Sequence, residues 1–441
     1  MKKIFVLFFN LLIISSLTSV AQVKSGPMVG YSDYKEVLVW VQTEKEASVK
    51  IVYWDKTNPS KKLSTDEIKT IKHDGFIAHC IADQVEHGKK YNYEVWVDKK
   101  KVNFDFPLEF QSQTLWQYRT DPPNFKFAAG SCAYINEPDV DRPGTPYGSD
   151  YEIFKAIYDK KPDFMIWGGD NNYYREVDWN TRTGVIHRNS ELKRLPEARA
   201  LFANTHHYAV YDDHDYGPND SDRSFWGKNM TLEVFKLFWP NPNFAFKDEG
   251  VTGTFFWNDC QFFLMDDRWW RTPNNRLSTG DRDYYGQKQL NWLIDALKSS
   301  QAPFKFVITG GQVINPAAVY ENMATYPEER KQLLDMITKE KIPGVFFISG
   351  DRHHTNLQKL EREGTYPLYD VTLSPLTSGA GAPVKEEVNS PIVEGTRVDK
   401  THNFGLFEVT GKRTDRVLKL SVFDKDGKEM WNKEFKAKDL R

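Results

Sequence analysis

FMIWGGD (164–170) is one of five apolar runs in this chain that stop at a small residue and continue with acid, histidine, glutamine or cysteine. The other four are FKFAAGSC (125–132), YAVYDDHD (208–215), FKFVITGGQ (304–312) and GVFFISGDRHH (344–354). Continuous apolar runs are typical of buried strands, and ligand sites in α/β sheets gather where such strands end. Because Asp, His and Cys are metal-binding residues, the runs predict one metal site assembled from several loops.

The chain divides into a β-rich part and an α/β part. Short β-rich runs separated by polar turns fill residues 24–120 and predict an N-terminal β-sandwich domain of immunoglobulin or fibronectin type. These runs are VLVWVQT (37–43), SVKIVYW (48–54), FIAHCIAD (76–83) and KYNYEVWVD (90–98). Asp121-Pro122-Pro123 then marks a boundary, which predicts that residues 121–441 form a second domain.

In the second domain the apolar runs alternate with three segments of helical periodicity. These segments are residues 150–160, 286–299 and 327–339. The alternation predicts an α/β domain whose sheets are covered by helices. Residues 216–250, rich in Asn, Pro, Asp and Trp, predict a long irregular insertion. Residues 416–435 predict a hairpin that turns at Asp426-Gly427.

Residues 1–21 have the features of a secretory signal peptide. Lys2 and Lys3 precede an apolar run at 4–14, and small residues lead to a cleavage point after Ala21. The alternative is a retained membrane anchor, but the apolar run is shorter than the ~20 residues that a span needs. We therefore expect export to the periplasm or the medium, with no membrane span in the mature protein.

Charge and cysteine content narrow the functional classes. Lys and Arg number 59 and Asp and Glu 61, so no basic excess indicates general nucleic-acid binding. The odd number of cysteines, Cys80, Cys132 and Cys260, leaves at least one thiol unpaired. We expect Cys80 and Cys260 to be inert buried thiols and Cys132, at a strand end, to have a special role.

Asp170 and Tyr173 follow the second apolar run. A carboxylate at this position can bridge two cations, and a phenolate oxygen can bind a hard ion such as Fe(III). Each residue also has a simpler interpretation, Asp170 as a turn or helix-capping residue and Tyr173 as a packed aromatic side chain.

Asp212-Asp213-His214-Asp215 places three carboxylates and an imidazole in four residues. Such a cluster repels itself unless a cation or open solvent relieves it. A solvated acidic loop is the alternative, but the preceding run YAVY brings the cluster to the edge of a sheet.

Residues 350–354 supply one carboxylate and two imidazoles after the last apolar run. An extended segment would point Asp351 and His353 to one side and His354 to the other.

Cys132 as a thiolate suits a transition metal and has no role with Ca²⁺, although a lone cysteine is more often structural.

These candidates form two sets with different metal preferences. Cys132, Asp170, Tyr173 and His353 suit Fe(III), whereas Asp170, Asp213 and Asp351 suit Ca²⁺. Other divalent cations, Mg²⁺, Mn²⁺ or Zn²⁺, are alternatives. Two adjacent cations are a standard device for phosphate-ester hydrolysis. Arg268, together with Arg271 and Arg175 as further candidates, would hold the phosphate oxygens, although each arginine also fits a surface or ion-pair role.

At these residues the chain resembles the alkaline phosphatase D family of calcineurin-like metallophosphoesterases. The motifs that carry the resemblance are Gly-Ser-Cys (130–132), Gly-Asp-x-x-Tyr (169–173), Asp-Asp-His-Asp (212–215), Asp-Arg (267–268), Gly-Gly-Gln (310–312) and Ser-Gly-Asp-x-His (349–353). Their order is specific, whereas any one of them alone is not. The family often has Glu where this chain has Asp215.

The resemblance implies an αββα sandwich after the N-terminal β-sandwich domain and a site with one Fe(III) and Ca²⁺ ions. The implied metal ligands are Cys132, Asp170, Tyr173, Asp213, Asp351 and His353. His214 would aid the leaving group or stabilise the transition state, and Arg268 would contact the phosphate.

The leading hypothesis is an exported phosphoesterase that hydrolyses phosphate mono- and/or diesters through a metal-bound hydroxide. One alternative keeps the fold and makes the protein a phosphodiesterase or phospholipase-like enzyme. The other alternative is a non-catalytic exported binding protein in which the metal is structural.

Overall fold

The computed structural model describes residues 23–277 and 282–441. The predicted signal peptide, residues 1–21, lies outside the described residues, and export stays a prediction. Within those two ranges, no helix combines the length and the apolar character that crossing a membrane requires.

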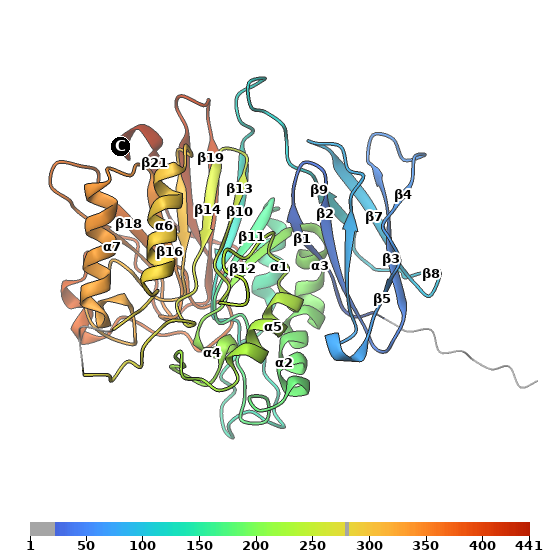
Figure 1. The fold of residues 1–441 in the computed structure, drawn as a ribbon, viewed down its shortest axis with the longest axis horizontal. Helices are drawn as coiled ribbons and strands as arrows, with labels where there is room; N and C mark the ends of the chain where they lie inside the picture. Colours follow the sequence, from blue (N-terminus) through green and yellow to red (C-terminus); the bar gives the residue numbers. More distant parts are fainter. Residues whose placement is uncertain (1–22, 278–281) are drawn as a thin grey trace, which may run out of the picture.

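The N-terminal part is a β-sandwich (Figure 1). One sheet contains β1 (Val23–Ser32), β2 (Val37–Thr43) and β6 (Ile77–Ala82). The other contains β3 (Ser48–Asp55), β4 (Leu63–Ser64), β5 (Ile68–Lys69), β7 (Lys90–Val97), β8 (Lys100–Lys101) and β9 (Glu109–Gln111). Valine and aromatic side chains from both sheets form its own core, including Val39, Val95 and Tyr53. The four predicted strands are confirmed, whereas β1, interrupted by glycine and proline, was not predicted.

A long sheet joins this sandwich to the second part of the chain. Its strand order is β21-β20-β19-β10-β11-β12-β1-β2-β6. Besides β1, β2 and β6, this sheet contains β10 (Phe125–Gly130), β11 (Phe164–Gly168), β12 (His206–Val210), β19 (Asn403–Thr410), β20 (Val417–Asp424) and β21 (Glu429–Lys436). β1 pairs in parallel with β12 at Val29 and His206. The first sheet therefore continues across the predicted domain boundary near residue 120. The division of the chain into two domains at this boundary stays a prediction. The C-terminal hairpin is confirmed.

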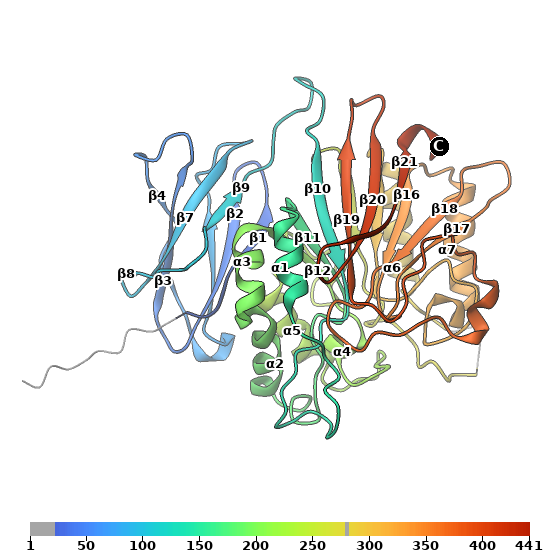
Figure 2. The ribbon, with the colours of Figure 1, turned by 180° about the vertical axis from the view of Figure 1, so that it is seen from behind.

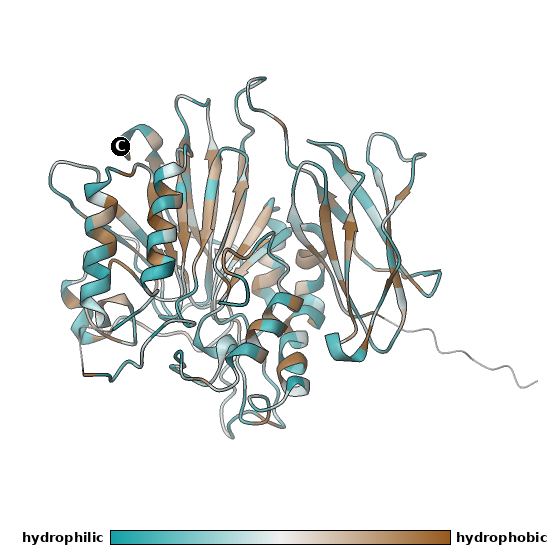
Figure 3. Ribbon diagram, viewed as in Figure 1, coloured by the Kyte–Doolittle hydropathy of each residue, from teal (hydrophilic) through white to brown (hydrophobic). Residues whose placement is uncertain are grey.

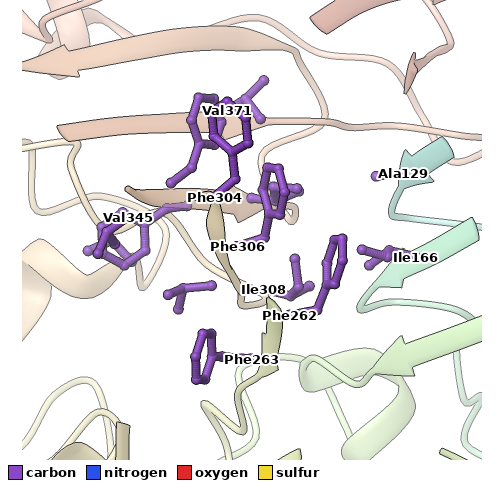
Figure 4. Close-up of a cluster of buried hydrophobic side chains, with 14 of the residues drawn as sticks. Ala129, Ile166, Phe262, Phe263, Phe304, Phe306, Ile308, Val345 and Val371 are labelled. Carbon is purple, nitrogen blue, oxygen red and sulfur yellow. The ribbon is translucent and has the colours of Figure 1, made fainter. Parts of the chain in front are cut away.

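A second sheet packs face to face against β10–β12 and β19–β21. Its order is β13 (Gly253–Trp257), β14 (Cys260–Leu264), β15 (Lys305–Ile308), β16 (Val345–Ser349), β18 (Leu368–Thr372) and β17 (Asn356–Leu360). Figure 4 shows Phe262 and Phe306 of this sheet facing Ile166 of the first. Between the sheets, the Phe127 ring stacks on Phe407 at a centroid distance of 4.4 Å. Such aromatic contacts contribute about 0.5–1.5 kcal/mol each beyond the area they bury.

Helices cover the outer faces of both sheets (Figure 1). The first sheet is covered by α1 (Glu152–Asp159), α2 (Arg182–Arg194), α3 (Pro196–Asn204) and α5 (Lys228–Phe238), and the second by α6 (Gln287–Ser299) and α7 (Pro327–Lys339). Figure 3 shows hydrophobic strands inside and mixed helices outside. This αββα sandwich with an N-terminal β-sandwich confirms the predicted fold class. The interpretation of residues 216–250 as irregular was wrong in part, because α5 lies within them.

Candidate metal centre

The predicted ligands follow the carboxyl ends of the strands, where the chain turns sharply. Cys132, Asp170, Asp351 and His353 have φ angles of 62°, 51°, 65° and 54°. L residues adopt this left-handed region rarely and at a cost in free energy. The expectation of an extended segment at 351–354 was therefore wrong, because two of its residues are left-handed. His354 is nonetheless fully buried, and within the described chain neither ring nitrogen has a hydrogen-bond partner.

Two glycines allow the loops to approach one another. Gly169 has a φ of 98°, and a Cβ there would lie 2.7 Å from the Cβ of Asp212. A Cβ on Gly310 would lie 2.4 Å from the Asp212 carboxyl carbon. Both distances are below any real Cβ contact, so the close approach requires glycine at both positions. Gln312, after the second glycine pair, instead donates a hydrogen bond to Thr372 and accepts one from Asn315.

The residues predicted to bind Fe(III) lie together. Ligand atoms of Cys132, Asp170 and His353 are all within 4.8 Å of one another. The Cys132 Sγ lies 3.6 Å from Oδ2 of Asp170. The Tyr173 hydroxyl is 3.1 Å from the same oxygen and 3.4 Å from Nε2 of His353. Four side chains from three separate loops therefore surround one small volume.

A second group shares Asp170 with the first. Ligand atoms of Asp170, Asp213 and His214 also lie within 4.8 Å of one another. His214, predicted only as a catalytic residue, is thus also placed where a ligand would be, and its ring centroid is 4.2 Å from that of Tyr173. Asp351 belongs to neither group, although the charges of Asp213 and His353 act on it.

A third group surrounds Arg268 and contains one residue that the sequence did not single out, Glu321. Asp212, Asp213 and Glu321 bring carboxylate oxygens within 4.8 Å of one another. Arg268 is 1% exposed; its Nε donates to Asp212 at 2.6 Å, and its two Nη atoms donate to Glu321 at 3.0 and 2.7 Å. These pairs occupy its donors, so contact with a phosphate requires one of them to break. Its predicted role stays a prediction.

Arg175 and Arg271, the two further phosphate-clamp candidates, are also engaged. Arg175 forms an ion pair with Asp141 at 2.7 Å. Arg271 is fully buried and lies 3.6 Å from Glu321.

Asp215 holds the acidic loop in shape. Its carboxylate accepts hydrogen bonds from the backbone N–H of Asp212 at 2.6 Å and from the backbone and side chain of Asn171 at 3.0 and 2.7 Å. Burial raises the pKa of Asp215 to about 7. This residue therefore links the loops after β11 and β12.

The electrostatics of the centre fit bound cations. Asp212 Oδ2, Asp213 Oδ1, Asp267 Oδ1 and Asp351 Oδ2 are buried and have no hydrogen-bond partner within the described protein. Unpartnered buried carboxylate oxygens are costly unless a positive charge compensates them.

The pKa shifts point the same way. Burial raises the pKa of the Cys132 thiol to about 11, and burial with the Asp213 charge raises the pKa of Asp170 well above its ordinary value. Burial also raises the pKa of Asp351 to about 7 and lowers that of His214. Asp213 differs: burial opposes its ionisation, but the charges of His214 and Arg268 hold its pKa at about 2. A bound cation would offset the burial effects, since metal ligands bind in their deprotonated forms.

Cys80 and Cys260 are buried and unpaired, as expected of inert thiols. A separate cavity of about 780 Å³ lies at the opposite end of the strands, beside Trp116 and Lys305. It contains none of the candidate ligands and has no part in the centre.

Comparison with known proteins finds two family models that match separate parts of the chain and a solved structure with the same fold. Residues 249–416 match the model of the PhoD-like phosphatase family, and residues 20–115 match a domain of unknown function, DUF7800. A solved structure titled "Structure of PhoD" is similar over 94% of this chain and 92% of that chain, with a TM-score of 0.75 and 15% sequence identity. A sensor domain of the anti-sigma factor RsgI4 in Pseudobacteroides cellulosolvens covers 29% of this chain and 90% of its own, at 12% identity and a TM-score of 0.19, and carries no argument. The chain thus carries a PhoD-like phosphatase domain and has the fold of PhoD, which confirms the resemblance inferred from the motifs.

Proposed function

We propose that this chain is an exported, metal-dependent phosphoesterase that hydrolyses phosphate mono- and/or diesters. The match of residues 249–416 to the PhoD-like phosphatase family and the fold shared with a solved PhoD structure support this proposal. The observation that carries the metal dependence is the position of Asp170, which belongs to two ligand groups at once. A carboxylate with two oxygens can bridge two cations, and each group then supplies further ligands on its own side.

The chemistry of the two groups suits two different ions. The thiolate of Cys132, the phenolate of Tyr173 and the imidazole of His353 would hold Fe(III) with Asp170. Asp213 of the second group, together with Asp351 from outside both groups, would hold Ca²⁺ with oxygen ligands. Mg²⁺, Mn²⁺ or Zn²⁺ are alternatives for either position. When bound, such a pair would polarise a phosphoryl oxygen and generate a nucleophile from water.

The protein's own side chains would position the phosphate ester and offset its negative charge. The His214 ring lies against Tyr173 at the mouth of the centre, where it can donate a hydrogen bond to a leaving-group oxygen. Arg268, held between Asp212 and Glu321, keeps positive charge next to Asp213. It would stabilise negative charge that develops on the phosphate oxygens.

Substitution of the shared carboxylate tests this proposal. We expect Asp170→Asn to lose bound metal, measured by elemental analysis of untagged protein, and to lower kcat on bis(p-nitrophenyl) phosphate at least about 10³-fold. Asp335→Asn changes an exposed carboxylate on α7 and serves as the matched control. An Asp170→Asn protein that keeps full metal content and activity would refute the proposal. Comparing kcat/KM on mono- and diester substrates then separates a phosphatase from a phosphodiesterase or phospholipase-like enzyme.

A further inference from the structure

A cavity of about 500 Å³ opens beside the candidate metal centre. Tyr173 and His214, which border the centre, also line this cavity. The other lining residues come from the loops after β10, β11 and β12, which lie together at the lower edge of Figure 2. Its volume is in the range of sites that bind small organic groups. A phosphate placed at the centre would therefore direct one of its substituents into this space.

The walls of the cavity are aromatic. Tyr134, Tyr147, Tyr174 and Trp179 line it. The rings of Tyr134 and Tyr147 meet edge to face at 4.9 Å and 74°, and Tyr147 is 47% exposed, so part of its ring is free for a ligand. The Tyr147 hydroxyl lies 3.1 Å from Nδ1 of His353, which fixes this ring relative to the candidate metal centre. The indole Nε1 of Trp179 is buried and has no hydrogen-bond partner in the described chain.

The charges that line the cavity balance one another. Arg175 forms an ion pair with Asp141 at 2.7 Å, and Tyr134 donates a hydrogen bond to the same carboxylate. The remaining charged residues, Arg142 and Glu176, have opposite signs. The cavity therefore offers flat apolar faces and no excess charge for a second anionic group.

We propose that this cavity binds the organic group of the ester and selects an aromatic ring, as in an aryl or nucleoside phosphate, over an open-chain polyol. The inference rests on the proposed phosphoesterase function. Stacking against rings of this kind corresponds to about a tenfold preference. Because Tyr134 and Tyr147 meet edge to face, the half-exposed ring of Tyr147 is the principal surface on which a substrate ring would stack.

Two substrate pairs with matched leaving groups test the preference. Adenosine 5′-monophosphate and glycerol 1-phosphate both release a primary alcohol, and their methyl diesters, adenosine 5′-(methyl phosphate) and glycerol 1-(methyl phosphate), both release methanol. In each pair only the adenosine compound carries an aromatic ring. We expect kcat/KM to be about tenfold higher for the ring-bearing member of the pair that the enzyme accepts. We expect Tyr147→Ala and Trp179→Ala to bring the ratio close to one, and Tyr147→Phe, which keeps the ring, to preserve it.

Tyr118→Ala is the control, because Tyr118 is 99% exposed and lies in the linker before β10. The ratio should not change in this variant. Equal kcat/KM values within the accepted pair would overturn the subsite while leaving the phosphoesterase function intact. A preference that survives both alanine substitutions would also overturn it. Absence of hydrolysis of all four esters and of bis(p-nitrophenyl) phosphate by metal-loaded protein would instead reject the function itself.

Discussion

Four of the six candidate ligands have a left-handed backbone conformation that L residues adopt rarely. Cys132, Asp170, Asp351 and His353 have φ angles between 51° and 65°, and each non-glycine residue in this region costs about 1 kcal/mol or more. Strain of this kind persists only where the surrounding structure enforces it. Here it lets each strand end turn its side chain into the space between the loops. The shared conformation of four of the six predicted metal ligands therefore supports a common functional role.

Gly169→Ala tests how tightly the loops are packed at the centre. The substitution combines a positive φ with a Cβ that would lie 2.7 Å from Asp212, so we expect it to lower the free energy of unfolding by about 3 kcal/mol. Gly364→Ala is the matched control, since its φ is 69° and a Cβ there would meet nothing within 4 Å. It should cost only about 1 kcal/mol. Equal shifts in the denaturant midpoints of the two variants would show that the clash with Asp212 is unimportant.

At the scale of the elements, His206 joins the two parts of the chain. It begins β12, its Nδ1 lies 2.8 Å from the carbonyl oxygen of Gly30 on β1, and its Nε2 accepts a hydrogen bond from the backbone of Gln111 on β9. These partners require a neutral ring that carries its proton on Nδ1. Burial lowers the pKa of His206 to about 4.

The protonation of His206 predicts loss of stability in acid. The folded pKa is about 4 and the unfolded value about 6.5, so the contribution is complete above pH 6.5 and disappears as the pH falls to about 4. The difference corresponds to about 3 kcal/mol. We expect His206→Asn to lower the free energy of unfolding at pH 7 and to remove this part of the pH dependence, measured as the difference between wild-type and variant curves. His73→Asn, at an exposed ring, should not change the curve. Parallel curves for wild type and His206→Asn between pH 4 and 6.5 would contradict the prediction.

The elements that could be predicted from the sequence are those with an uninterrupted apolar pattern. The five strand-end runs and the segments that became α1, α6 and α7 have such a pattern. Helix α2 was missed for a physical reason: its buried face carries Arg188, Asn189 and Lys193 instead of an apolar stripe. Arg188 is compensated by Asp178 at 2.8 Å, and Lys193 lies over the ring of Trp239 at 3.3 Å. Partners that distant in sequence leave no periodic signal.

At the scale of the whole molecule, the centre needs loops from both sheets. Motifs next to strand ends indicated most of the candidate site, because a strand end is a local feature. Glu321 could not be predicted, since it belongs to no motif and gains its importance only from Arg268, which lies 53 residues away in sequence. The first sheet also continues through β1 into the N-terminal sandwich. The two parts of the chain are therefore coupled through shared strand pairing as well as through the linker between them.

This coupling predicts that residues 121–441 are unstable without the N-terminal sandwich. Removing residues 24–120 would expose the edge of β12, and a free strand edge promotes aggregation. It would also uncover α5, whose Leu237 carbonyl accepts a hydrogen bond from Trp40 at 2.8 Å and whose Phe238 ring packs against the same tryptophan. We expect the fragment to show a lower soluble yield and a lower denaturant midpoint than the full chain. Full-length protein cut by a protease at an engineered site in the exposed residues 118–120 is the control, because it keeps the contacts between the two parts and loses chain continuity. It should remain associated and keep its activity. A monomeric 121–441 fragment with the midpoint of the full chain would show instead that the shared sheet contributes little, and that the boundary near residue 120 separates two independently stable domains.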